Sequence, residues 1–370
     1  MSKKRVVVKV GSSSLAKDQG GCDLDKMQLI VSTIATLRDA GHEVVLVSSG
    51  AVASGYTRLG FERRPRKLAA KQAAAAVGQG LLMQNYNQLF GTYDYTVAQI
   101  LLTRGDFSDQ ERYRHAFQTV SLLLSRGVIP IINENDTVSV SELTFSDNDM
   151  LGALVAGLVH ADLYVILTDT DGFYDKHPQK YPDAKRFSTI GEITPELLAL
   201  AGDAGSLGTG GMRSKLIAAQ TAQQLGISTF IGRAVDEQSL MHILEGNGEG
   251  TYAHHPSHTT GEKNSVPARK QWIAIHSRVS GEIHVDAGAA EALLEKNRSL
   301  LLAGICRVIG SFDPGEVVDV YTDGKPIGRG KTRFSADELR IAIARPDGIR
   351  LSGDVINRDH WVSQPVSSYR

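Results

Sequence analysis

The chain is poor in cysteine and has almost no net charge. Only two of its 370 residues are cysteines, Cys22 and Cys306, which are too few and too far apart for a disulfide framework. A formal net charge of −1 gives no general attraction to nucleic acid or to an anionic membrane. The longest apolar region, 150–168, is interrupted by His160 and Asp162, so we expect no membrane span. These absences favour a soluble, cytoplasmic globular protein without a signal peptide.

The chain does contain short apolar runs that alternate with segments of helical periodicity. We expect strands at 6–10, 43–48, 96–101, 128–132, 163–167 and 228–231. We expect helices at 23–40, 66–89, 106–126, 148–158 and 211–225. This alternation predicts an α/β fold, a three-layer αβα sandwich around a mainly parallel sheet. Ligands of such a sheet bind beyond the carboxyl ends of its strands.

The pattern changes after residue 252. Residues 253–270 are polar and contain two prolines, so we interpret them as a linker, and their histidines lack partners at metal-ligand spacing. Residues 271–357 predict a small β-rich, barrel-like domain, and 358–370 a C-terminal tail. Within this domain we expect one helix at 287–294 and short strands at 272–275, 282–285, 304–308 and 317–321.

Lys9 lies inside the apolar run of the first expected strand. A buried ammonium group without a partner is costly, so Lys9 needs an anion at the carboxyl end of that strand. Gly11 and the serines after it form a loop whose backbone can approach an anion closely. The alternative is that Lys9 reaches the surface or pairs with a nearby aspartate. This motif alone does not decide between them.

Residues 208–215, Gly-Thr-Gly-Gly-Met-Arg-Ser-Lys, open an expected helix, where free N–H groups favour anions. Arg213 and Lys215 have the wrong sign for the helix dipole, by about 0.3–1 kcal/mol each, and a bound phosphate would remove that conflict. The alternative is a glycine loop with two solvated bases. Residues 324–332 resemble a P-loop but have five residues between their glycines instead of four, so we interpret them as a turn.

Residues 133–149 place Asp136, Asn148 and Asp149 between a strand end and the next helix. Their carboxylates suit a substrate ammonium group or a magnesium ion, or they anchor the two lysines. The alternative is helix capping by Asp147 or Asn148.

The same residues suit transfer of the γ-phosphoryl group of ATP to a carboxylate. Both reactants are anions, so catalysis is mainly positioning and neutralisation by cations. A glutamate-type carboxylate, with a pKa of about 4.3, is already ionised at neutral pH and needs no general base. The motifs accordingly contain lysines, glycines, amides and aspartates but no evident catalytic histidine.

As an ordered set, the motifs resemble those of the glutamate 5-kinases, of the amino acid kinase family. The resemblance covers 5–252 and rests on VVVKVGSSSL (6–15), LVSSGAVASG (46–55), PIINENDTVSV (130–140), SDNDMLGALVA (146–156), LTDTDGFYD (167–175) and GTGGMRSK (208–215). The closing region resembles a PUA domain, through GEIHVDAGAAEALLEKNRSLL (281–301) and GSFDPGEVVDVY (310–321). Together the two resemblances imply that 1–252 is an amino acid kinase domain and 271–357 a PUA-like domain.

The resemblance implies ATP-dependent phosphorylation of the γ-carboxylate of L-glutamate to L-glutamyl 5-phosphate, the first step of proline biosynthesis. It implies Mg²⁺ as a cofactor, inhibition by proline, and a homo-oligomer, dimer or tetramer, formed through the kinase domain. In catalysis, Lys9 and Lys215 would neutralise the transferred group and Asp149 would hold both lysines in place.

The resemblance also assigns binding residues, and none of them is a direct metal ligand. Glutamate would be bound by Ser49, Gly50, Asp136 and Asn148, with Asp136 facing its ammonium group. ATP would be bound by Lys9, Gly11, Thr168, Asp169, Thr209, Gly210, Gly211, Met212 and Lys215.

Two alternatives remain open. A sibling kinase for aspartate, acetylglutamate, carbamate or UMP would share the glycine loops and lysines, although the block at 133–149 and the PUA-like region argue against it. The other alternative is an RNA-binding or regulatory protein that retains a kinase scaffold. Residues 268–370 contain 15 Lys and Arg against 13 Asp and Glu, which is weak for binding a phosphate backbone.

Overall fold

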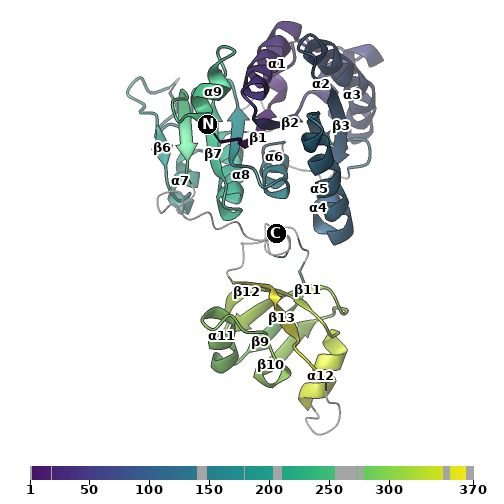
Figure 1. Cartoon of the computed structure of the whole chain (residues 1–370), viewed down its shortest axis with the longest axis vertical. Coiled ribbons are helices and arrows are strands. Elements are labelled where there is room, and N and C mark those ends of the chain that lie inside the picture. Colours follow the sequence, from purple (N-terminus) through teal and green to yellow (C-terminus); the bar gives the residue numbers. More distant parts are fainter. Residues whose placement is uncertain are drawn as a thin grey trace. The chain divides into compact units, whose positions relative to one another are not determined.

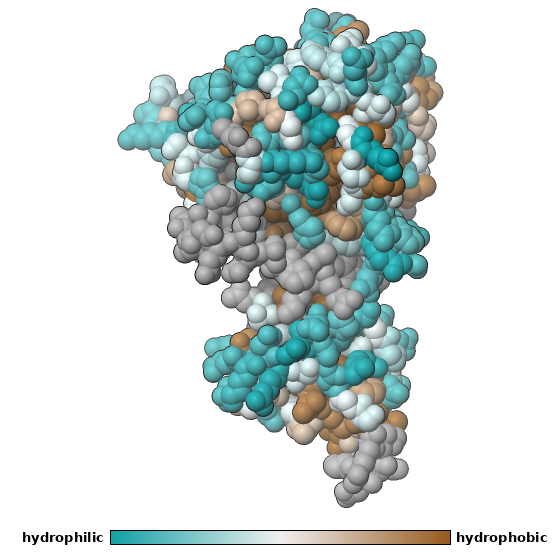
Figure 2. Space-filling model, in the orientation of Figure 1, coloured by the Kyte–Doolittle hydropathy of each residue, from teal (hydrophilic) through white to brown (hydrophobic). Residues whose placement is uncertain are grey.

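The computed structural model describes residues 2–17, 19–139, 148–178, 180–202, 211–254, 273, 277, 279–344 and 351–363. The chain divides into two compact units (Figure 1). The first comprises Met1–Asp106 and Tyr113–Ser265, and the second comprises Phe107–Arg112 and Val266–Arg370. In the view of Figure 2, hydrophilic side chains cover most of the visible surface of the described residues. None of the helices in these ranges is long and apolar enough to cross a membrane.

An eight-stranded sheet forms the centre of the first unit, with the strand order β3-β4-β2-β1-β5-β7-β8-β6. The six strands from β3 to β7 in this order pair in parallel, and β8 is antiparallel to β7. The strands are β1 (Arg5–Val10), β2 (Glu43–Ser48), β3 (Val97–Leu102), β4 (Ile129–Glu134), β5 (Leu163–Leu167), β6 (Thr189–Ile190), β7 (Ser228–Gly232) and β8 (Gly250–Ala253). The six expected strands are confirmed to within two residues at each end.

Helices cover both faces of this sheet (Figure 1). The helices that precede β8 along the chain are α1 (Leu24–Asp39), α2 (Ala51–Gly55), α3 (Leu68–Gly91), α4 (Arg104–Ser108), α5 (Gln110–Ser125), α6 (Asn148–Leu158), α7 (Pro195–Leu200), α8 (Met212–Gln224) and α9 (Ser239–Leu244). The single helix expected at 106–126 was wrong. The Asp109 carboxylate accepts hydrogen bonds from the backbone N–H groups of Glu111 and Arg112, both at 2.9 Å, and so caps a new helix at that point.

The alternation of side chains along β1 decides what each face of the sheet contacts. Val6, Val8 and Val10 join a core cluster with residues of α1, α3 and α9. Lys9 has the opposite parity and therefore points to the other face, where α6 packs on β1 and on α8. One apolar strand thus builds the core with one face and positions a cation with the other.

Gly78 of α3 lets that helix approach α2 closely. A Cβ atom on Gly78 would overlap the Ala51 carbonyl oxygen and lie 2.6 Å from the Gly55 nitrogen. We expect Gly78→Ala to lower the free energy of unfolding by about 1–3 kcal/mol, measured by urea denaturation. Gly80→Ala is the matched control, because a Cβ there meets nothing within 4 Å. We expect it to stabilise the helix by about 0.5–1 kcal/mol, and equal effects of the two variants would contradict the packing argument.

The second unit contains a five-stranded sheet with the order β10-β9-β11-β12-β13. Its neighbours pair antiparallel except for β9 and β11, which are parallel. The strands are β9 (Val279–Val285), β10 (Ile305–Gly310), β11 (Val317–Thr322), β12 (Lys325–Thr332) and β13 (Ile356–Ser363), and the helices are α11 (Ala287–Leu294) and α12 (Ala336–Ala344). β10 and β13 stand at the two ends of the strand order.

Several expectations for this unit need correction. The P-loop-like segment is a hairpin whose turn at Asp323 and Gly324 leads into β12 rather than a turn throughout. The tail expected from 358 begins later, because β13 continues to Ser363 and Trp361 is buried in the core cluster. The strand expected at 272–275 lies outside the described residues except for Ile273, which is helical.

Candidate active site

Two lysines from opposite ends of the first unit's sequence meet one carboxylate of α6. Lys9 Nζ lies 2.5 Å from Asp149 Oδ1, and Lys215 Nζ, from the first turn of α8, lies 3.0 Å from Asp149 Oδ2. Asp149 is 0% exposed, Lys9 4% and Lys215 8%. The three residues predicted to be catalytic are therefore brought together, at the carboxyl end of β1. Lys9 therefore pairs with an aspartate, as the alternative for this residue had it, and its contact with a substrate anion stays a prediction.

The electrostatics of this trio favour an additional anion. Burial by itself would raise the pKa of Asp149, but the Lys9 and Lys215 ammonium groups outweigh it and hold the pKa below its usual range. The carboxylate is therefore ionised at neutral pH. Two ammonium groups share the one carboxylate of this trio, and cations in buried positions attract anions.

The backbone around the trio is fixed from several sides. The Tyr164 hydroxyl donates a 2.7 Å hydrogen bond to the Asp149 carbonyl oxygen, and Ser214 Oγ donates to the Gly211 carbonyl oxygen at 2.8 Å. Gly11 leaves space next to Lys9, because a Cβ atom there would lie 3.6 Å from Lys9 Nζ. The sequence did not single out Tyr164 or Ser214, since neither stands out from its surroundings in the chain.

A network of amides lies next to the trio, where α6 begins. Asn148 Nδ2 donates to Ser49 Oγ and to Asn133 Oδ1, both at 2.9 Å, and to the Ser48 carbonyl oxygen at 3.3 Å. Gly50 follows with a φ of 109°, a conformation that favours glycine, and starts α2. Ser49, Gly50 and Asn148, all predicted for glutamate, thus lie together. Asn133 was missed, although it lies in the same motif at the end of β4.

Asp136 lies in the loop after β4 and is half-buried. Burial raises the pKa of its carboxyl group above the usual value, while the charge of Arg64 acts in the opposite direction. Among the described residues its carboxylate has no hydrogen-bond partner. Its oxygens are therefore available to a ligand. The adjoining segment 141–146, whose contacts sequence analysis left open, lies outside the residues described.

The residues predicted for ATP lie in two places. Thr168 follows β5, next to β1, where its backbone N–H donates to the Gly232 carbonyl oxygen at 2.9 Å and its hydroxyl contacts Asp169. Gly211 is the N-cap of α8 and has no side chain to cap the helix, and its carbonyl oxygen accepts from the N–H groups of Ser214 and Lys215. Thr209 and Gly210 lie outside the described residues.

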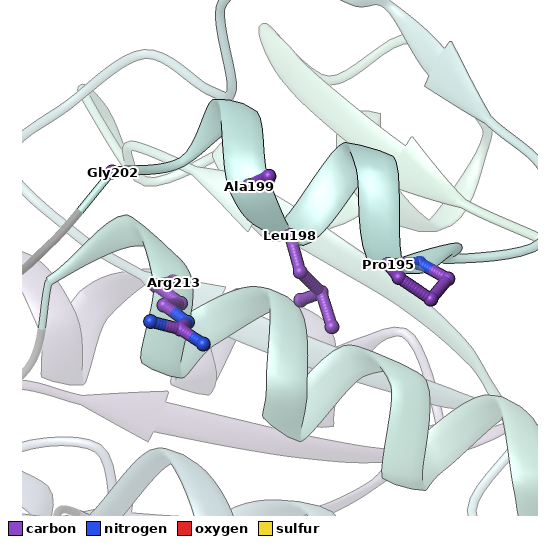
Figure 3. A pocket seen from close by; sticks show the side chains of 5 residues that line it. All are labelled: Pro195, Leu198, Ala199, Gly202 and Arg213. Atoms are coloured by element: carbon purple, nitrogen blue, oxygen red, sulfur yellow. The ribbon is translucent and has the colours of Figure 1, made fainter.

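Arg213, in the first turn of α8, faces a cavity of about 370 Å³ (Figure 3). The other lining residues come from α7 and the residues just after it: Pro195, Leu198, Ala199 and Gly202. As for metals, the described ranges contain no group of three or more His, Cys, Asp or Glu residues arranged to hold an ion.

The chain is similar to known proteins over nearly its whole length. A sequence model described as the amino acid kinase family matches residues 4–233, and one for the PUA domain matches 281–346. The chain is 52% identical to a glutamate 5-kinase of Bacillus cereus (strain B4264), covering 98% of this chain and 100% of that protein. It is 53% identical to glutamate 5-kinase 1 of Bacillus subtilis (strain 168), covering 98% and 99%. Among solved structures, carbamate kinase from Giardia lamblia bound to AMP-PNP superposes with a TM-score of 0.49 at 17% identity, covering 68% of this chain and 99% of that one.

Proposed function

This chain belongs to the amino acid kinase family, within its glutamate 5-kinases, and on that premise we propose how its own residues perform the reaction. It catalyses ATP-dependent phosphorylation of glutamate, the first step of proline biosynthesis. The observation that carries the residue assignment is the buried pair of ammonium groups sharing the Asp149 carboxylate.

The γ-carboxylate of glutamate attacks the γ-phosphorus of ATP, and the bond from that phosphorus to ADP breaks. Lys9 and Lys215 lie on either side of Asp149, so both can offset the negative charge that gathers as the two anions approach. Asp149 keeps the ammonium groups in place without accepting a proton, because its lowered pKa keeps it ionised. The attacking carboxylate is ionised at neutral pH, with a pKa of about 4.3, and no general base is required.

We place glutamate at Ser49, Gly50, Asp136 and Asn148, and we call this set of residues the glutamate pocket. Asp136 accepts the substrate's ammonium group, and the loop after β2 faces the rest of the amino acid. The Ser49 backbone N–H donates to the Val10 carbonyl oxygen at 3.1 Å, which holds this loop beside β1 and therefore beside Lys9. The γ-carboxylate can then reach the lysines while the ammonium group stays at Asp136.

We place ATP and Mg²⁺ on the side of Lys9, Asp149 and Lys215 that faces away from the glutamate pocket. The two ammonium groups, Gly11 beside Lys9 and the N-terminus of α8 fit the phosphates, with Thr168 and Asp169 nearby. Thr209 and Gly210 complete this assignment. Mg²⁺ bound to the phosphates would shield their charge, and we place it on ATP oxygens and water rather than in a protein cage.

We also place proline in the glutamate pocket as an inhibitor. Proline carries the same ammonium and α-carboxylate groups as glutamate but lacks the accepting γ-carboxylate, so it can occupy the pocket without reacting. We assign the enzyme to the cytoplasm, in keeping with its free cysteines, Cys22 and Cys306. The family resemblance implies oligomerisation through the kinase domain. The nearly balanced charge of the PUA-like region argues against binding of RNA.

Trapping of the acyl phosphate tests this function. With ATP, Mg²⁺ and hydroxylamine, we expect L-glutamate to give the γ-hydroxamate, and proline to lower the yield in competition with glutamate. Aspartate, acetylglutamate, carbamate and UMP serve as alternative acceptors in a coupled ADP assay. Faster turnover with any of them than with glutamate would overturn the substrate assignment.

We expect Asp136→Asn to raise the KM for glutamate about 10- to 100-fold, because the negative charge that strengthens the hydrogen bond to the ammonium group is lost. The KM for ATP should stay within twofold. Since burial raises the pKa of Asp136, the KM of the wild type for glutamate should also rise on acidification, starting above the usual pKa of an aspartate. Steady-state kinetics with each substrate varied measure both effects. Asp25→Asn, on α1, is the control, and equal changes in the two KM values would argue against an ammonium contact.

A further inference from the structure

A chain of side-chain amides runs from the sheet edge to the glutamate pocket. Gln99 of β3 accepts a 3.0 Å hydrogen bond from Gln79 Nε2 on α3, and Gln79 Oε1 accepts a 2.9 Å hydrogen bond from Asn133 Nδ2 on β4. Asn133 Oδ1 then accepts from Asn148 Nδ2, which also donates to Ser49. Gln79 has no direct contact with Ser49 or Asn148, so any influence it has on substrate passes through Asn133.

Backbone groups identify which amide atom is the oxygen and which is the nitrogen at Asn133 and Asn148. The Glu134 N–H donates to Asn133 Oδ1 at 2.8 Å, and an N–H can only donate, so that atom of Asn133 is the oxygen. The Asn148 atom that faces Asn133 also faces the Ser48 carbonyl oxygen, which can only accept, so this atom is the nitrogen. The remaining atoms follow, and Asn133 must present its nitrogen to an acceptor on Gln79.

This polarity determines what Asn148 offers to a ligand. Its nitrogen is engaged by three acceptors, whereas its Oδ1 has no donor among the described residues. Asn148 therefore presents an acceptor, which suits an ammonium group and would repel a carboxylate. The acceptor on Gln79 keeps this arrangement, because a donor there would turn Asn133 over and place its nitrogen against two other N–H donors.

Helix α3 supports the pocket at a second point. Tyr86, seven residues after Gln79 and hence on the same helix face, has its hydroxyl 2.9 Å from Ser48 Oγ. The hydroxyl and the amide thus hold the loop after β2 and the end of β4 from one rigid element. Positioning by a helix is more exact than positioning by the loops themselves.

We propose that Gln79 is a positioning residue that, through Asn133, turns the oxygen of Asn148 toward the ammonium group of the substrate and so makes the enzyme selective for a free α-amine. This rests on the proposed placement of glutamate beside Asn148. The proposal concerns binding of the amine end, so it predicts an effect on the KM for glutamate and none on the KM for ATP.

Three variants test it by hydroxamate kinetics. Gln79→Met keeps the size but removes the acceptor, and we expect the KM for glutamate to rise about tenfold with kcat within threefold. Gln79→Glu keeps the acceptor for Asn133, and exposed Gln99 can rotate to donate to it, so the KM should stay within threefold of wild type. Gln99→Met, the matched control, removes only the outermost bond and should change the KM less than twofold.

The inhibition constant of glutarate separates positioning from general damage. Glutarate has both carboxylates but no amine, so Gln79→Met should leave its inhibition constant within twofold of wild type. A parallel rise for glutarate and glutamate, or a glutamate KM that Gln79→Met does not change, would overturn the proposal. Should Gln79→Met fail to fold, Gln79→Lys replaces it, since a donor at this position should raise the glutamate KM even more.

The activity of the wild type separates a failure of this proposal from a failure of the proposed function. An inactive wild type would refute glutamate phosphorylation as a whole. An active wild type, together with a Gln79→Met variant whose KM for glutamate is unchanged, would refute only the role of Gln79.

Discussion

Lys215→Ala is expected to lower kcat by about 10²–10³-fold while the protein remains folded. The variant loses one of the two ammonium groups that face the transferred phosphoryl group, and loss of one such preorganised charge typically has this effect. The fold should tolerate the change, because Lys9 and Asp149 remain as a neutral buried pair 2.5 Å apart. Single-turnover and steady-state assays measure the rate, and thermal unfolding measures the stability.

Lys296→Ala provides the control for Lys215→Ala. Lys296 is an exposed lysine that pairs with Glu291 in the second unit, so its loss should change neither kcat nor the KM for ATP. A Lys215→Ala enzyme with the kcat of the wild type would show that the lysine of α8 has no part in phosphoryl transfer.

Asp149→Asn, unlike Lys215→Ala, should lose much of its stability as well as its activity. The substitution removes the carboxylate that the two buried ammonium groups share. We expect the free energy of unfolding to fall by about 3–5 kcal/mol, the usual cost of breaking a buried ion pair from one side. Urea denaturation of both variants gives the comparison, and an Asp149→Asn protein as stable as Lys215→Ala would contradict the charge count.

Adding an anion and changing the pH give two further tests of the Asp149→Asn variant. Inorganic phosphate or ATP should raise the melting temperature of Asp149→Asn more than that of the wild type, because the anion replaces the missing charge. In the wild type the pKa of Asp149 is lowered on folding, so its contribution to stability is complete above the unfolded value near 3.8 and is lost as the pH falls through the lower folded value. Asp149→Asn should lack this acid-dependent component.

Much of the fold could be predicted because its signals are local. The apolar runs of β1, β2 and β5 and the periodicity of α6 and α11 depend on residues adjacent in the chain. The break between α4 and α5 was missed, since the same segment is compatible with one helix until Asp109 turns its carboxylate to the backbone of the next turn. β12 and β13 were also missed, because glycines and charged residues interrupt their apolar pattern.

The site was predicted in its residue types and only in part in its connections. Lys9, Asp149 and Lys215 could be named because a lysine in a buried strand and a base at a helix start conflict with their surroundings. The family resemblance implied that Asp149 holds both lysines, but the contact itself appears only in the folded chain. Gln79 gave no signal at all, because a glutamine on a half-exposed helix face is ordinary in sequence.

The order of residues along the chain thus determined the parallel α/β architecture, the second β-rich unit and the charged groups at the strand ends, since backbone preference and side-chain burial act over a few neighbouring residues. Only the tertiary structure decided how closely the two lysines approach Asp149 and which way the amides of Asn133 and Asn148 point. The reason is that ion pairs and hydrogen bonds require atoms within about 3 Å in a set direction, and folding alone brings together residues separated by more than two hundred positions.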